Sequence, residues 1–244
     1  MRYFKNYLAI LAFLVASSQL NASSTLITVV KSKKAWADET RNVSGFKGIS
    51  SAGSYDIVIT MGNSEILRLE GDPEQIAGIE TVVENGTLKI RNMKNSSNWT
   101  ARTGKVNIYI TAKSLEHITL SGSGDINVKG VVRSADISNT LSGSGSISLA
   151  VDAKNYSATI SGSGEINASG KTDNARINVN GSGDFNGRDL RTKVTSAKVS
   201  GSGDISVNAD EALSAAMSGS GNIRYSGNAS VKTSKSGSGR ISKL

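Results

Sequence analysis

The residues with most capacity for chemistry form a periodic row of acidic and polar side chains. Each follows a Gly-Ser-Gly triplet, and the row consists of Asp125, Ser146, Glu165, Asp184, Asp204, Asn222 and Arg240. Carboxylate and amide oxygens are the ligands that Ca²⁺ prefers, so one interpretation is a row of weak calcium sites. The other is turn chemistry, because Asp and Asn suit tight corners and accept hydrogen bonds from nearby backbone amides. Ser146 and Arg240 interrupt the row, which favours turn chemistry, and we assign no metal ligand.

The sequence offers no set of residues with the types and spacing of a known catalytic site. His117 is the single histidine, cannot form a histidine metal site alone, and is expected to be structural. The serines include no Gly-x-Ser-x-Gly elbow, and the absence of cysteine excludes disulfides and thiol nucleophiles. Asp184 and Asp204 would lie on neighbouring coils, too close to flank a glycosidic bond and a water molecule. We assign no catalytic and no cofactor-binding residue and expect no enzyme. The alternative is a minimal or degenerate polysaccharide-active β-helix enzyme.

Seven copies of Gly-Ser-Gly indicate the elements that position these side chains. Successive copies are 18 to 21 residues apart, and they start at Gly122, Gly143, Gly162, Gly181, Gly201, Gly219 and Gly237. Two residues before each start, and mostly apolar, lie Leu120, Leu141, Ile160, Val179, Val199, Met217 and Lys235. Four residues after each start lie Ile126, Ile147, Ile166, Phe185, Ile205, Ile223 and Ile241. These are strand patterns on either side of a corner whose backbone angles glycine supplies.

Two architectures fit this pattern, an antiparallel meander of hairpins and a solenoid. Isoleucine recurring at one position favours the solenoid, in which like residues stack with about 4.8 Å between coils. We therefore predict an all-β fold, a right-handed single-stranded parallel β-helix with repeats of roughly 19 residues. Lys235 and Lys243 replace apolar residues in the last copy and predict a solvated cap.

Residues 38–115 are predicted to form a β-rich N-terminal part of the same domain as the repeat β-helix at residues 116–244. Alternating segments predict strands at residues 55–60, 66–69, 81–84, 88–91 and 106–110. Asn85 and Gly86 are typical of a two-residue hairpin turn. The Asp72-Pro73-Glu74-Gln75 segment predicts the start of one short helix near residues 73–78. The polar segment 92–104 is predicted to be a loop.

The chain begins with the features of a secretory signal peptide. Arg2 and Lys5 precede an apolar run at residues 8–16, which is too short to span a bilayer as a helix. Small residues up to Ala22 complete a cleavage signal for a peptide of residues 1–22, and a second signal could extend it to residue 37. We expect an exported protein, in the periplasm or at the cell surface, with no integral membrane segment after cleavage.

The formal net charge of +8 does not indicate a nucleic-acid partner. Cleavage after Ala22 would leave +6 and cleavage after Ala37 would leave +3. The remaining basic residues are scattered among acidic ones, whereas nucleic-acid-binding proteins concentrate them on one face. A weak attraction to anionic envelope polymers is consistent with this charge.

Several separated motifs give the chain a family resemblance. They are Val-Ser-Gly-Phe at 43–46, Leu-Glu-Gly-Asp at 69–72, the segment 83–90, and Gly-x-Ile-Asn at 124–127 and 164–167. Over roughly residues 40–244 the chain resembles the bacterial family called putative auto-transporter adhesin, head GIN domain. The resemblance implies a single-stranded right-handed β-helix, export across the inner membrane and an adhesin role, with no catalytic residue. We expect a non-catalytic cell-envelope module, adhesive or structural, whose partner is unknown; an envelope or extracellular glycan or protein fits the polar surface.

Overall fold

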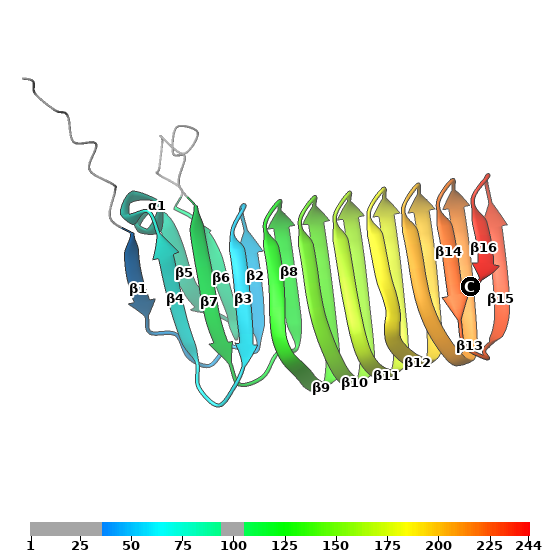
Figure 1. Ribbon diagram of the computed structural model, residues 1–244, viewed down its shortest axis with the longest axis horizontal. Helices are drawn as coiled ribbons and strands as arrows, with labels where there is room; N and C mark the ends of the chain where they lie inside the picture. Colours follow the sequence, from blue (N-terminus) through cyan, green and yellow to red (C-terminus); the bar gives the residue numbers. More distant parts are fainter. Residues whose placement is uncertain (1–35, 94–104) are drawn as a thin grey trace, which may run out of the picture. The chain divides into compact units, whose positions relative to one another are not determined.

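The computed structural model describes residues 36–93 and 105–244, and they are built almost entirely from strands (Figure 1). The strands ahead of the repeats are β1 (Ala37–Arg41), β2 (Gly48–Ala52), β3 (Asp56–Met61), β4 (Ile66–Gly71), β5 (Ile79–Glu84), β6 (Thr87–Asn92), β7 (Val106–Ala112) and β8 (His117–Gly122). The short helix α1 (Pro73–Ala77) lies between β4 and β5. The repeats form β9 (Asp125–Gly143), β10 (Ser146–Gly162), β11 (Glu165–Gly181), β12 (Asp184–Gly201), β13 (Asp204–Gly219), β14 (Asn222–Ser226), β15 (Ser230–Ser236) and β16 (Arg240–Lys243).

Each long repeat strand is one coil of a parallel solenoid. β9 to β13 begin after a Gly-Ser-Gly corner, run along one arm, bend, and return along a second arm to the next corner (Figure 1). Neighbouring coils pair in parallel, so that Ile147 lies between Ile126 and Ile166. This pairing confirms the predicted parallel solenoid of roughly 19-residue repeats, since a meander would pair antiparallel.

The two arms are defined by their strands. The first arm contains β4, β7, β3 and the first halves of β9 to β13, followed by β14 and β16. The second arm contains β5, β6, β2, β8 and the second halves of β9 to β13, followed by β15. The inward side chains of both arms form one buried apolar cluster. It includes the predicted isoleucine ladder as far as Ile223, whereas Ile241 on the last coil is only partly buried.

The Gly-Ser-Gly corners stack directly on one another, and the two glycines of a corner are needed for different reasons. Gly201, a first glycine, has a φ of +128°, in the region that favours glycine. A Cβ on Gly201 would lie 2.3 Å from the carbonyl oxygen of Gly181 in the corner below. Gly203, a second glycine, has no such φ, but its Cβ would lie 2.1 Å from the oxygen of Gly183. The first position therefore requires glycine for backbone angle and space, and the second for space alone.

The N-terminal strands do not stack in the order of the sequence. β2 pairs in parallel with both β6 and β8, and β3 pairs in parallel with both β7 and β9. The coil made by β2 and β3 therefore lies inside the stack, next to the first repeat. Its corner, Gly53-Ser54-Tyr55, is an eighth corner beyond the seven expected from the Gly-Ser-Gly copies. Asp56 and Ile57 after it align with Asp125 and Ile126 after the first Gly-Ser-Gly.

The outermost N-terminal layer reverses direction. β4 pairs antiparallel with β7 and with β1, and β5 pairs antiparallel with β6. The N-cap Asp72 accepts a hydrogen bond from the Glu74 amide (2.9 Å), with Pro73 at the start of α1. Asn85 and Gly86 join β5 to β6 with φ values of +50° and +72°. The predicted helix and hairpin are therefore confirmed.

The C-terminal layer is exposed, as predicted from its lysines. β15 is solvent-exposed along almost its whole length, and Lys235 Nζ donates to the carbonyl oxygen of Gly239 at 2.9 Å. Two other predictions fall mainly outside the described residues. They are the signal peptide at residues 1–22 and the loop at 92–104, of which the structure describes only residues 92 and 93. The later cleavage position, after residue 37, falls at the start of β1.

Candidate functional site

The acidic row lies on the outer surface of the first arm, where it joins neighbouring coils. Ser146 Oγ donates to Asp125 Oδ1 at 2.7 Å, and the Asp204 amide donates to Asp184 Oδ1 at 2.9 Å. Asp204 Oδ1 in turn accepts from the Asn222 amide at 2.8 Å. These contacts are the turn chemistry that competed with calcium binding in the sequence. Over residues 36–93 and 105–244, no three His, Cys, Asp or Glu side chains are grouped so that they could hold a metal ion.

His117 lies at the start of β8, over a glycine of the neighbouring coil. A Cβ on Gly48 would lie 1.8 Å from His117 Nε2, so the ring occupies the space above that residue. Nε2 is 2.9 Å from Thr87 Oγ1 on β6. This contact links two strands across β2, which supports the structural role that we expect. In the described part of the chain, no carboxylate is hydrogen-bonded to this ring to orient it as a catalytic base.

The outer surface of the second arm carries columns of serine and threonine, which we call the hydroxyl face. The column nearest the corners consists of Ser121, Ser142, Ser161, Asn180, Ser200, Ser218 and Ser236. The next consists of Thr119, Thr140, Thr159, Asn178, Lys198, Ala216 and Ser234. The third consists of His117, Ser138, Ser157, Arg176, Ser196, Ser214 and Lys232. Neighbours in a column are about 4.8 Å apart, the spacing of paired strands.

Buried residues between these columns hold the hydroxyls outward. Leu141 and Ile160 are fully buried and alternate with the outward threonines and serines, as side chains do along a strand. Deeper in the core, Asn139 Nδ2 donates to the hydroxyl of Tyr156 at 2.9 Å. Burial raises the pKa of Tyr156 far above its ordinary value, so this phenol stays protonated.

A groove of about 510 Å³ crosses the hydroxyl face from Glu116, just before β8, to β12. It is lined by Ser157, Asn155, Asn174 and Arg176, among other residues. Asn155 Nδ2 donates to Asp136 Oδ1 at 2.8 Å, and Asn174 Nδ2 donates to Asn155 Oδ1 at 3.0 Å. This row of one carboxylate and two amides runs along the stack and forms one border of the groove.

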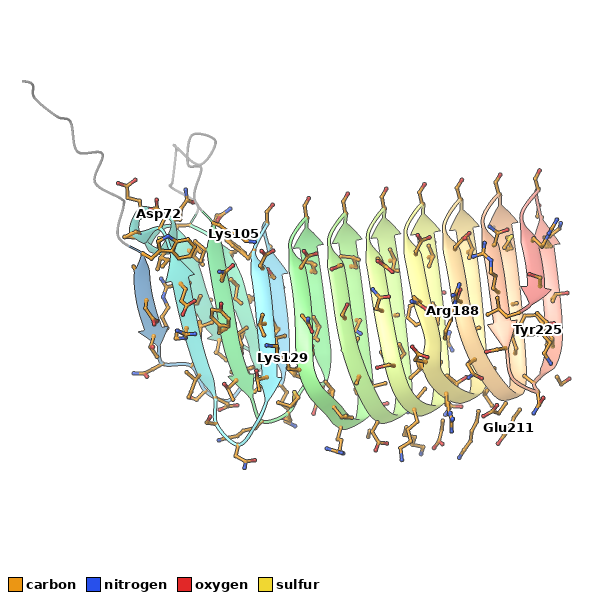
Figure 2. All side chains as sticks on the ribbon, viewed as in Figure 1. Asp72, Lys105, Lys129, Arg188, Glu211 and Tyr225 are labelled. Atoms are coloured by element: carbon orange, nitrogen blue, oxygen red, sulfur yellow. The ribbon has the colours of Figure 1, made fainter. Side chains whose placement is uncertain are left out.

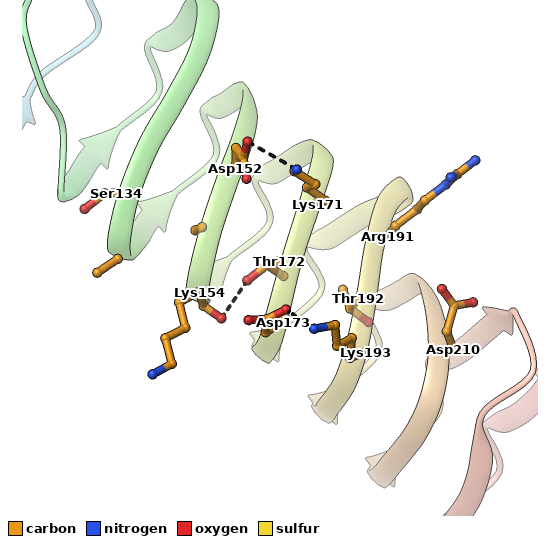
Figure 3. A pocket seen from close by; sticks show the side chains of 12 residues that line it. Ser134, Asp152, Lys154, Lys171, Thr172, Asp173, Arg191, Thr192, Lys193 and Asp210 are labelled. Atoms are coloured by element: carbon orange, nitrogen blue, oxygen red, sulfur yellow. Dashed lines mark hydrogen bonds and ion pairs between the residues drawn. The ribbon is translucent and has the colours of Figure 1, made fainter.

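A second groove, of about 620 Å³, follows the bends of β9 to β13 (Figure 3). Opposite charges alternate here from coil to coil: Lys171 Nζ lies 3.5 Å from Asp152, and Lys193 Nζ lies 2.7 Å from Asp173. The hydrogen bond from Lys193 lowers the pKa of Asp173. Figure 2 shows charged side chains projecting from the bends, where Glu211 is labelled. The bends therefore offer a mixed surface in which acids offset part of the positive charge.

A third groove, of about 450 Å³, lies on the first arm. It is lined by outward side chains that include Asn127, Ser148, Asn167 and Asn186, and Asn186 Nδ2 donates to Asn167 Oδ1 at 3.2 Å. All three grooves are shallow, and each combines hydrogen-bonding side chains with apolar surface. This combination suits a ligand that carries several hydrogen-bonding groups.

We did not locate the hydroxyl face from the sequence, because we assigned no site residue. Its signal was present in the serines and threonines one, three and five residues before each corner glycine, such as Ser142, Thr140 and Ser138. Only the parallel register shows that these residues form flat columns on one arm.

Comparisons with known proteins agree with this architecture. A crystal structure of a putative adhesin from Bacteroides fragilis NCTC 9343 matches with a TM-score of 0.79 and 24% identity, over 86% of this chain and 98% of the other. A putative lipid binding protein from Parabacteroides distasonis ATCC 8503 matches with a TM-score of 0.70 and 26% identity, over 86% and 96%. A putative adhesin from the same strain matches with a TM-score of 0.70 and 19% identity, over 87% and 98%. No curated protein matches the chain.

The family comparison covers most of the sequence. Residues 45–229 match the sequence model of a family described as putative auto-transporter adhesin, head GIN domain. The match includes the N-terminal strands from β2 onward, all the long coils and β14. The chain therefore belongs to the head GIN domain family of putative auto-transporter adhesins.

Proposed function

We propose that this chain is an exported, non-catalytic binding protein of the cell envelope, which holds an extended polar partner such as a glycan along the hydroxyl face. The observation that carries the proposal is the in-register stacking of outward serines and threonines on one arm. Family membership and neighbours described as adhesins are consistent with a binding module. In this proposal residues 1–22 direct export, and the remaining β-rich part and repeats act as one domain.

An extended repeating partner fits this surface better than a compact one. Coil after coil offers similar hydroxyl groups at intervals of about 4.8 Å, so a polymer can make the same contacts several times. Each hydrogen bond contributes only about 0.5–1.5 kcal/mol, which means that useful affinity requires many of them. The shallow groove on this face crosses several coils, so such a chain can follow it along the stack.

Two other functions receive less support. One structural neighbour is described as a putative lipid binding protein, but in this chain the space between the arms is filled by buried side chains. A lipid would have to bind to outer surfaces, where the described grooves are shallow and carry many hydrogen-bonding side chains. A polysaccharide-active enzyme remains the alternative in this proposal, and turnover of an acidic polysaccharide that is lost in Asp184→Ala would support it.

A glycan panel tests the proposal directly. The purified chain is screened against envelope and extracellular polysaccharides, with binding and product formation recorded together. Ser157→Trp places a large ring on the hydroxyl face, and Ser148→Trp places the same ring on the first arm of the same strand as a control. We expect binding without product, lost in the Ser157 variant and kept in the Ser148 variant. Equal binding by both variants, or a negative panel, would refute this proposal.

Cellular location needs its own measurement. Among the described residues the helix α1 has five residues, and no helix there is long and apolar enough to cross a membrane. We expect a tag placed after Leu244 to be found outside the cytoplasm. Protease treatment of intact cells would remove a tag at the cell surface and spare a tag in the periplasm, whereas a tag in the cytoplasm would contradict export.

A further inference from the structure

Three cations on the C-terminal half of the hydroxyl face have no partner in the described part of the chain. Arg176, Lys198 and Lys232 lie on β11, β12 and β15, and all three are exposed. No carboxylate lies within ion-pair distance of any of them among residues 36–93 and 105–244. An exposed cation without a partner is available to an anionic ligand.

On the second arm, no acidic side chain occupies an outward position of the strands that carry these cations or of β13 between them. On β11, β12, β13 and β15 the outward positions of the second arm are serine, asparagine, alanine, valine, arginine or lysine. The last acidic residue of the sequence is Glu211, at a bend. The bends differ, because there Asp152 and Asp173 lie beside Lys171 and Lys193. Glu116 and Asp136 line the same groove as Arg176 but lie toward its N-terminal end, so the outward positions around the three cations carry positive charge alone.

The register places the three cations in two adjacent columns of the stack. Arg176 aligns with Ser196, then with Ser214, then with Lys232, so the two cations stand three coils apart in one column. At about 4.8 Å per coil their backbones are about 14 Å apart. Lys198 stands one coil from Arg176 in the adjacent column, as the partner of Asn178. Hydroxyl groups fill the positions between the cations.

We propose that this part of the hydroxyl face binds an acidic polysaccharide, whose carboxylate, sulfate or phosphate groups pair with Arg176, Lys198 and Lys232. The inference rests on the proposed function and specifies the class of glycan. The hydroxyls of Ser196 and Ser214 lie between the charged contacts and donate to sugar oxygens. An extended polymer can reach all three cations, which a small anion cannot.

The same surface does not fit other polyanions as well. A membrane surface typically binds clusters of four to eight cations, often with apolar side chains that insert. This face has three cations, and Val194 at its margin is the single exposed large apolar side chain on β11, β12, β13 and β15. Single-stranded nucleic acid binds through aromatic stacking platforms, and the outward positions of these three columns contain no phenylalanine, tyrosine or tryptophan.

The test compares polymers of different charge on immobilised surfaces. The whole chain is measured against polygalacturonate, uncharged dextran and vesicles containing anionic phospholipid, at low and raised salt. We expect polygalacturonate to bind best, and more weakly at high salt because exposed charge pairs are screened. Replacing Arg176, Lys198 and Lys232 together by glutamine should weaken this binding about tenfold. Three exposed ion pairs contribute together about 1.4 kcal/mol, which corresponds to a factor of ten.

A matched control separates position from net charge. Lys129→Gln, Arg133→Gln and Lys154→Gln remove two lysines and one arginine from exposed positions at or near the bends. We expect the control to stay within twofold of the original chain, with unchanged circular dichroism for both triple variants. An equal loss in both variants, or equal binding of dextran and polygalacturonate, would overturn the inference, as would preferential binding to vesicles. One outcome separates the inference from the proposed function. If Ser157→Trp abolishes binding of a neutral glycan, while glutamine at positions 176, 198 and 232 does not weaken binding of polygalacturonate, the inference fails and the proposed function stands.

Discussion

Alanine substitution at three glycines separates the two reasons for which this fold needs glycine. Gly201 has a positive φ, and its Cβ would overlap the corner below at 2.3 Å. Gly203 has no positive φ, but its Cβ would lie 2.1 Å from a backbone oxygen. Gly45 has a φ of +75° and no heavy atom within 4 Å of the position that a Cβ would take, so it represents backbone strain alone. The three variants therefore isolate strain, overlap and their combination.

The expected losses of unfolding free energy follow from these geometries. A left-handed backbone costs a non-glycine residue about 1–2 kcal/mol, which is the loss expected for Gly45→Ala. Overpacking costs about 1–3 kcal/mol, and a backbone oxygen at 2.1 Å cannot move aside without separating two coils, so Gly203→Ala should reach the upper end. Gly201→Ala combines both and should lose about 3–5 kcal/mol. The reduced entropy of the unfolded chain is common to all three variants and cancels in the comparison.

Urea unfolding followed by far-ultraviolet circular dichroism measures these losses. The product of the midpoint shift and the common m value gives the change for each variant, provided that m is the same in all. Ser202→Ala, at the exposed position between the two glycines, is the control and should change little. If Gly203→Ala is no more destabilising than Gly45→Ala, the corners are not in contact and the explanation of the Gly-Ser-Gly repeat is wrong.

Further predictions concern the core and the charged bends. Tyr156→Phe removes the acceptor of the buried Asn139 amide and should destabilise by about 1–3 kcal/mol in urea; no change would mean that the amide has another partner. Burial raises the pKa of Tyr55 to about 12, above about 10 in the unfolded chain, so the phenol's contribution is complete below pH 10 and is lost as pH rises from about 10 to 12. Thermal midpoints across this window measure the loss, and a flat profile would contradict the burial of this tyrosine. Lys193→Ala removes the hydrogen bond that lowers the pKa of Asp173, so that pKa should rise in an NMR titration while the urea midpoint hardly changes, because the pair is exposed.

The repeat corners could be predicted from sequence because packing leaves no alternative to glycine there. The eighth corner, Gly53-Ser54-Tyr55, was not predicted because Tyr55 occupies the position of the second glycine. A corner needs that glycine only when another tight corner lies directly below it. The coil below Tyr55 is formed by β6 and β7, whose connection spans residues 93–105 rather than a triplet. The ring of Tyr55 instead lies beside Gly53, and its hydroxyl bonds to Asn92.

The stacking order of the N-terminal coils could not be predicted. The hairpin at Asn85 has a local turn signal, because adjacent antiparallel strands are joined by specific residues. Parallel pairing of β2 with β6 and β8 joins segments that are distant in sequence, and no local residue type encodes such a partner. Alternating patterns predicted β3 to β7 but not β1 or β2, and the neighbours of each strand depended on how the apolar faces fit together.

A polar outer surface could be predicted from the sequence, but the position of the hydroxyl face on the second arm could not. Inward residues repeat closely because each must fill the space between the arms, as Ile147 and Ile166 do. Outward residues are free of that constraint, so their columns mix serine and threonine with asparagine, alanine, arginine and lysine. A binding surface of this type becomes visible only when the register aligns the columns.

The most direct test of binding on the hydroxyl face uses the absence of cysteine from the sequence. Ser157→Cys on the hydroxyl face and Ser148→Cys on the first arm each give one labelling position, on opposite arms of β10. The measurement is the rate at which a thiol reagent modifies each variant, with and without saturating acidic polysaccharide. We predict that the polymer slows modification of the cysteine at position 157 and leaves position 148 unchanged. Equal rates at position 157 with and without bound polymer would contradict binding on the hydroxyl face.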